Sequence, residues 1–67
     1  MILSEDEKRI KNLISDKAYL MSLKLEQLNT VTMERAAYRS HVHQILDEAQ
    51  GLAILAKKLE REAYLND

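Results

Sequence analysis

Cysteine and proline are absent from this chain, and glycine occurs only once, at Gly51. Without cysteine the protein has neither a disulfide framework nor a thiolate nucleophile. A single glycine excludes the glycine-rich loops that cradle nucleotide phosphates. Tryptophan and phenylalanine are also missing, so the aromatic side chains are those of Tyr19, Tyr38 and Tyr64. These absences exclude thiol-based catalysis and phosphate-loop enzymes, and what remains is a sequence with few helix breakers.

Charge and hydrophobicity exclude two further classes of protein. Ten basic residues against eleven acidic ones give a net charge of −1, without the basic excess that nucleic-acid binding requires. No apolar run approaches the roughly 18 residues of a membrane span. The acidic segment 4–7 is unlike the basic start of a secretory signal, so we expect a cytoplasmic protein. A chain of 67 residues buries little core, and we expect it to depend on a partner.

Caps and apolar spacing predict one all-α domain spanning residues 1–67. It would contain three short antiparallel helices, at about residues 4–28, 32–44 and 47–64. The first begins with a capping box, in which Ser4 and Glu7 satisfy each other's backbone amides. β-Branched and short polar residues at 29–32 indicate a turn, and Asn29, Thr30 or Thr32 can cap a second helix that starts near Thr32. Asp47-Glu48-Ala49-Gln50 resembles another capping box and would open the third helix.

A two-helix hairpin is the alternative to three helices. Apolar or small side chains recur at four- and three-residue spacing across the proposed boundary, at positions 38, 42, 45, 49, 52, 56 and 59. Gly51 costs a helix about 1 kcal/mol but does not end it. The second and third helices can therefore be one continuous helix.

The first helix has two contrasting faces. Leu13 and Leu20 centre an apolar stripe that we expect to pack on the other helices, flanked by Ile10, Met21 and Leu28. The opposite face carries short side chains within about 40° of one line, namely Ser15, Ala18, Ser22 and Asn29. Glu26 is the one long carboxylate at the edge of this strip. Such a strip fits a plain solvated face, or a surface that another protein approaches closely while Glu26 reaches outward.

No catalytic or metal-binding constellation is found. His41 and His43 are two residues apart and point about 200° apart on a helix, so together they cannot chelate one ion. The carboxylates clustered at 5–7 and 60–67 are expected to lie on solvated helix surfaces. We therefore predict a protein that is not an enzyme and that binds no metal, cofactor, nucleic acid or membrane.

The segment 22–28 resembles the inhibitory motif of the VbhA-like antitoxins, small proteins that inhibit Fic-domain toxins in trans. Ser22, Leu25 and Glu26 match the Ser-x-x-Leu-Glu-Gly core of this family. The opening Leu3-Ser4-Glu5 lies a similar distance upstream, and the likeness extends over residues 3–60. Gln27 departs from the motif, which has glycine or asparagine at that position.

The resemblance implies a heterodimer with a Fic-domain toxin, an enzyme that transfers AMP from ATP to a hydroxyl of a target protein. In this family the motif glutamate, here Glu26, pairs with the Fic arginine that would hold the ATP γ-phosphate. Ser22 would line the same cleft, and neighbouring residues of the first helix would contact the toxin, namely Ser15, Ala18, Tyr19 and Asn29. Gln27 continues a helix readily, and it leaves the inhibitory carboxylate unchanged.

Two other functions fit the same composition. A hairpin of this kind can self-associate as a scaffold, two copies forming a four-helix bundle. It can also serve as a small secretion chaperone that holds a partner helix. Both functions predict that Glu26 is an ordinary solvated residue.

Overall fold

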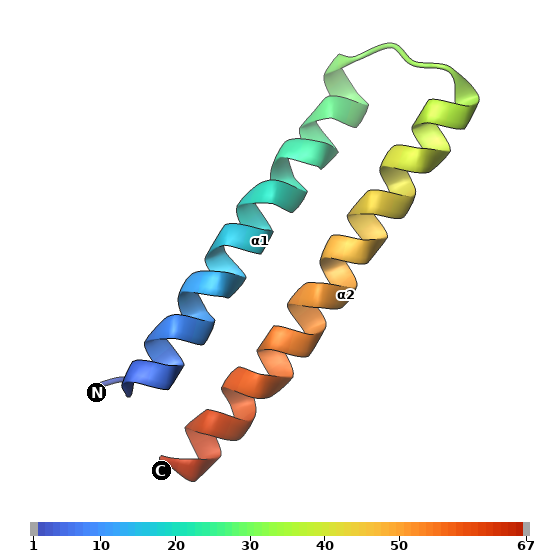
Figure 1. Ribbon diagram of the computed structural model, residues 1–67. Helices are drawn as coiled ribbons and strands as arrows, with labels where there is room; N and C mark the ends of the chain where they lie inside the picture. Colours follow the sequence, from blue (N-terminus) through green and yellow to red (C-terminus); the bar gives the residue numbers. More distant parts are fainter. Residues whose placement is uncertain (1, 67) are drawn as a thin grey trace.

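The computed structural model describes residues 2–66, which form two long helices and no strand. Helix α1 runs over Glu5–Thr30 and helix α2 over Arg35–Leu65. The helices lie side by side and antiparallel, with both chain ends at the same end of the hairpin (Figure 1). The hairpin measures 49 × 16 × 12 Å. The all-α prediction is confirmed, and the two-helix hairpin is the arrangement observed.

The predicted capping box at the start of α1 is confirmed. The Glu7 amide donates to Ser4 Oγ at 3.1 Å, and the Ser4 amide donates to Glu7 Oε1 at 3.0 Å. Three acidic residues occupy the first turn, where the positive end of the helix dipole favours them. The Asn66 side chain also donates to Ser4 Oγ, at 3.5 Å. The start of α1 is therefore joined to the end of α2.

Separate helices at 32–44 and 47–64 are wrong, because α2 is continuous across the predicted boundary. Asp47 does not cap a helix: it lies inside α2, where its Oδ2 is 3.8 Å from Nε2 of His43. Gly51 also lies within α2, at a negative φ that suits a helix. Packing against α1 stabilises α2 along its length. This stabilisation exceeds the effect of a local capping signal at Asp47, so the helix continues through it.

The turn lies slightly later than predicted. Helix α1 continues to Thr30, whose hydroxyl donates to the carbonyl of Glu26 at 3.0 Å. Residues 31–34 form the link, and the N-cap of α2 is Glu34, without a side-chain hydrogen bond. None of the predicted cap residues, Asn29, Thr30 and Thr32, caps α2, although the β-branched and polar residues correctly indicated where the chain reverses.

The helices meet along a seam of less exposed side chains with the alternating three- and four-residue spacing of a coiled coil. The α1 seam consists of Glu7, Ile10, Ile14, Lys17, Met21, Lys24 and Leu28. The α2 seam consists of His41, Ile45, Glu48, Leu52, Leu55, Leu59 and Glu62. Among residues 2–66, Ile10 is the one buried hydrophobic side chain, at 8% exposed. The hairpin therefore encloses almost no core of its own.

The apolar stripe predicted on the first helix is displaced in the structure. Leu13 and Leu20 do not centre the seam, and each is 47% exposed on one side of it. Lys17 and Lys24 lie in the seam instead, because each forms an ion pair with Glu48 of α2. The leucines are thereby left open on the flank of the hairpin.

Gly51→Ala should raise the free energy of unfolding by about 0.5–1 kcal/mol, because alanine is favoured over glycine inside a helix. A Cβ at this position would lie 3.2 Å from Lys17 Cε, and this flexible end of the side chain can shift. Urea unfolding followed by far-UV circular dichroism at low micromolar concentration measures the change. Ala53→Gly, two residues along, is the matched control and should cost about 1 kcal/mol. A destabilised Gly51→Ala protein would show that Lys17 cannot move.

Candidate functional site

A charged layer crosses the seam near the middle of the hairpin. Glu48 of α2 lies between two lysines of α1, with Oε1 at 3.4 Å from Lys24 Nζ and Oε2 at 3.5 Å from Lys17 Nζ. The Glu48 side chain is 18% exposed, and its buried Oε2 has no hydrogen-bond partner. The hydrogen bond from Lys24 holds the pKa of the Glu48 carboxyl below its ordinary value, assisted by the charge of Lys17 and opposed by partial burial. The layer joins the helices through charge rather than through apolar contact.

The hairpin has two open sides, one on each side of the seam. A groove on one of them identifies residues of α1 and α2 that lie on the same side. The groove, about 470 Å³, is lined by Arg9 and Leu13 of α1 together with Lys58, Arg61 and Leu65 of α2. Residues at the same helical offset continue this surface along both helices. Its exposed apolar residues are Leu13, Leu20, Leu23, Ile54 and Leu65, and we name it the leucine side.

The second open side of the hairpin is formed by the residues of α1 and α2 that lie on the other side of the seam from this groove. Its exposed apolar residues are Ala18 and Leu25 of α1 with Val42, Leu46, Ala49, Ala53, Ala56 and Ala63 of α2. We name this surface the alanine side. Five of these eight apolar residues are alanines, whose side chains are single methyl groups.

The residues predicted to form an inhibitory surface are all on α1, but they do not all face one way. Four short side chains and Leu25 turn toward the alanine side, these being Ser15, Ala18, Ser22 and Asn29. Tyr19 and Glu26 are seven residues apart on the ridge that points directly away from α2. Gln27 turns toward the leucine side, so the helix separates it from Ser22.

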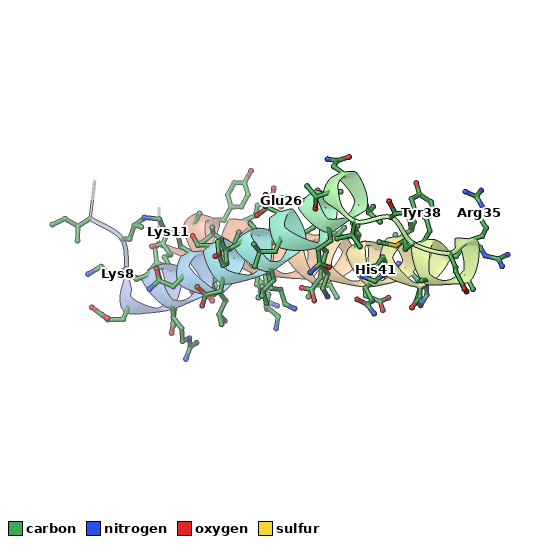
Figure 2. All side chains as sticks on the ribbon, turned by 90° about the horizontal axis from the view of Figure 1, so that it is seen from above. Lys8, Lys11, Glu26, Arg35, Tyr38 and His41 are labelled. Atoms are coloured by element: carbon green, nitrogen blue, oxygen red, sulfur yellow. The ribbon has the colours of Figure 1, made fainter. Side chains whose placement is uncertain are left out.

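Glu26 projects into solvent from the outside of the hairpin (Figure 2). Among residues 2–66 its carboxylate has no ion-pair partner closer than 4 Å. One turn earlier, the Ser22 hydroxyl donates to the carbonyl of Tyr19 at 2.8 Å. The Ser22 oxygen is therefore left as an acceptor, and Glu26 places a negative charge one turn further along the outside of α1.

The two histidines are separated, as their spacing predicts. The ring of His41 lies in the seam, where Nδ1 is 3.0 Å from the carbonyl of Ala37 and donates to it. His43 lies on the exposed surface of α2 and faces Asp47. Among residues 2–66, no three histidine or acidic side chains gather where they can hold a metal ion.

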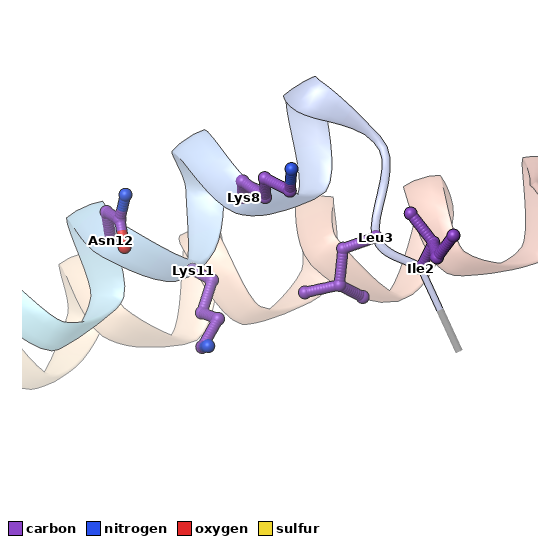
Figure 3. Close-up of a pocket in the computed structure, with 5 residues that line it drawn as sticks. All are labelled: Ile2, Leu3, Lys8, Lys11 and Asn12. Carbon is purple, nitrogen blue, oxygen red and sulfur yellow. The ribbon is translucent and has the colours of Figure 1, made fainter.

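A second hollow, about 510 Å³ and open to solvent, lies beside the start of α1 (Figure 3). Its lining residues are Ile2, Leu3, Lys8, Lys11 and Asn12. They combine two aliphatic side chains with two ammonium groups and one amide, without a carboxylate, an imidazole or a hydroxyl. The hollow therefore offers a contact surface and no arrangement for catalysis.

Comparisons with protein-family models, with characterised proteins and with solved structures find no match for this chain. The likeness to the VbhA-like antitoxins therefore depends on the motif residues themselves. Among the residues that the structure describes, neither helix has a stretch that is long and apolar enough to cross a membrane.

The charged layer is the feature that reasoning from sequence missed. Lys17 and Lys24 are one heptad apart, and each continues the spacing set by Ile10, Ile14 and Met21. That spacing places the two lysines in the seam and calls for an acidic residue on the opposite helix, which Glu48 supplies. The signal was present in the sequence, but an apolar reading of the stripe excluded it.

Acid should destabilise the hairpin through Glu48. The folded-state pKa of Glu48 is lowered, so its contribution is present above the carboxyl's ordinary value and is lost as pH falls through the lower folded value. We expect Glu48→Gln to melt at a lower temperature at pH 7 and to lose less stability between about pH 5 and pH 3. Thermal melts at each pH measure this. Exposed Glu60 gives the control variant Glu60→Gln, which should keep the wild-type pH profile. If the melting temperatures of Glu48→Gln and of the wild type fell equally with pH, the acid sensitivity would not come from Glu48.

Proposed function

We propose that this hairpin acts by binding another protein, and that its partner is a Fic-domain AMP-transferase whose activity it inhibits. Burial supports the first part of the proposal. Ile10 is the one hydrophobic side chain shielded from solvent among residues 2–66, while both flanks carry open apolar residues. Exposed apolar area on this scale is typical of a surface that another polypeptide covers.

The position of Glu26 supports the second part. Its exposed carboxylate lies on the outer ridge of α1, one turn after Ser22, with no ion-pair partner within residues 2–66. An arginine that binds a phosphate presents a fork of donors, and a carboxylate can occupy that fork in place of the phosphate. Transfer from ATP depends almost wholly on positioning and charge, so losing the γ-phosphate contact misplaces the nucleotide.

The alanine side gives α1 room to enter a cleft beside Glu26. Ser15, Ala18 and Ser22 are short and exposed, so a facing backbone can approach α1 closely on the flank next to the ridge. Gln27 points to the other flank and stays clear of this approach. Because antitoxin and toxin must meet before the enzyme acts, we place their encounter in the cytoplasm.

A second candidate function rests on the same open flanks. A hairpin with apolar sides can hold an exposed helix of another protein, as a scaffold or a small secretion chaperone does. This function needs the flanks and makes no use of the Glu26 carboxylate. The two candidates therefore differ in what a change at Glu26 does.

The first experiment identifies the partner. The tagged chain is expressed in its host, and the proteins that copurify with it are identified by mass spectrometry. The antitoxin proposal expects a Fic-domain protein in equimolar amount. Recovery of a partner without a Fic domain would contradict the antitoxin proposal and favour the scaffold or chaperone.

Glu26→Gly should release AMP transfer by the purified complex, measured with labelled ATP, while the two proteins remain bound. One charge-assisted contact contributes about 1.5–3 kcal/mol, which a protein interface of ordinary size can lose without dissociating. Glu26→Gln keeps the length but loses the charge, so it should also inhibit poorly. Gln27→Gly, one residue along and on the other flank, is the control and should remain inhibitory.

The inhibition mechanism is wrong if the Glu26→Gly complex stays intact and as inactive as the wild type. It is also wrong if Gln27→Gly releases as much AMP transfer as Glu26→Gly, because the blocking charge would then not be the one assigned.

A further inference from the structure

We propose that two copies of this hairpin associate through their leucine sides, with α2 of one copy lying antiparallel to α2 of the other. The resulting four-helix bundle goes beyond the inhibitory function, which uses the outer ridge and the alanine side. The self-associating surface and the toxin-binding surface are thus on different flanks of one hairpin.

The exposed area indicates that one flank is covered by another chain. The hairpin exposes 5481 Å², whereas a compact monomer of this mass exposes roughly 4,400 Å². An ordinary interface covers about 800 Å² on each partner. One such contact would bring the surface of each chain close to that of a compact protein.

The leucine side has the side chains that a bundle core requires. Leu13, Leu20 and Leu23 of α1 and Ile54 of α2 are open along it, Ile54 being 58% exposed. Burying branched aliphatic residues is the main favourable contribution to association in water. The alanine side exposes three branched side chains, those of Leu25, Val42 and Leu46, and its other apolar residues are alanines, which contribute less area per residue.

Charge selects the direction of the second copy. Arg9, Lys58 and Arg61 line the groove near the end of the leucine side that carries the chain termini, together with Glu62. Arg9 also pairs with Asp6 at 3.1 Å, so three cations and two acids leave this end with a positive charge. If two hairpins stacked with the ends that carry the chain termini together, these cations would face one another. Reversing the second copy separates them, so the antiparallel arrangement avoids the repulsion.

The antiparallel arrangement also has a defined register. Asp47 and Lys58 lie eleven residues apart on the leucine side of α2, and Gly51 and Ile54 lie between them, centred on the same midpoint. A two-fold axis through that midpoint pairs Asp47 of each copy with Lys58 of the other. The same axis places Ile54 of each copy beside Gly51 of the other, where the end of the Lys17 side chain also lies. Asp16 lies one heptad before Leu23 on the leucine side, next to Lys17, whose side chain reaches Gly51. The axis therefore brings Asp16 of one copy near Asp16 of the other. Removing this repulsion with Asp16→Asn should strengthen the association.

Sedimentation of the isolated chain from about 5 to 500 µM tests the association. We expect the weight-average mass to rise from that of one chain toward that of two across this range. Ile54→Lys should weaken the dimer at least tenfold. Ala53→Lys is the matched control, since it adds the same charge to the same helix on the alanine side, and its dimer should persist. A wild-type chain that stays monomeric at 500 µM, or equal weakening by both variants, would overturn the proposal.

Exchange of the paired charges tests the direction and register. Asp47→Lys and Lys58→Asp should each weaken the dimer severalfold, and the double variant should restore it, because the pair is re-formed with reversed signs. Circular dichroism at high concentration checks that each variant remains helical. Additive losses without rescue would overturn the antiparallel register. These measurements use no toxin, so their failure leaves the Glu26 mechanism standing.

Discussion

The ion pairs between Glu48 and the two lysines of α1 determine how the two helices align. A thin hairpin has no deep core to fix the sliding of one helix along the other, so the short link at residues 31–34 and specific interactions across the seam must do so. If α2 moved by one heptad, His41 or Leu55 would replace Glu48 between Lys17 and Lys24. Neither offers a negative charge at neutral pH, and the two ammonium groups would lose their partner. The observed alignment is therefore the one that keeps the partly buried charges paired.

The same layer explains why the hairpin has open apolar flanks. Two seam positions of α1 are occupied by lysines, so Leu13 and Leu20 lie beside the seam rather than in it. Their apolar surface is not used to hold the hairpin together. The proposed association with a second chain would give that surface a partner, and mass action would then stabilise the folded form. Alignment within the chain and the proposed contact between chains thus use different residues.

Much of the local structure could be predicted from sequence because it depends on neighbouring residues. The capping box at Ser4 and Glu7 and the reversal near residue 31 follow from side chains within one or two turns. The number of helices stayed open between three and two, because the capping signal at Asp47 competes with the unbroken three- and four-residue spacing from 38 to 59. The capping signal at Asp47 is real as a pattern, but continuous packing on α1 overrides it. Whether that packing exists depends on residues more than 20 positions away.

The candidate site was predictable to the same limited degree. A regular helix places Glu26 on a ridge with short neighbours on one flank, and the structure has both features. Helix geometry also separates Gln27 from Ser22, which the linear motif does not reveal. The Glu48 layer required knowing which faces of the two helices meet. That depends on the pairing of charges across the seam, and an apolar pattern alone does not report it.

The central claim is that this hairpin is completed by contact with another chain, and concentration-dependent unfolding tests it most directly. Thermal melts of the isolated protein, followed by far-UV circular dichroism at about 5 and 500 µM, compare the same molecule with and without its neighbours. The account predicts a broad, low-temperature transition at the lower concentration and a sharper, higher midpoint at the upper one. A single sharp, high-temperature midpoint, the same at both concentrations, would show that the hairpin is complete on its own and would contradict the account.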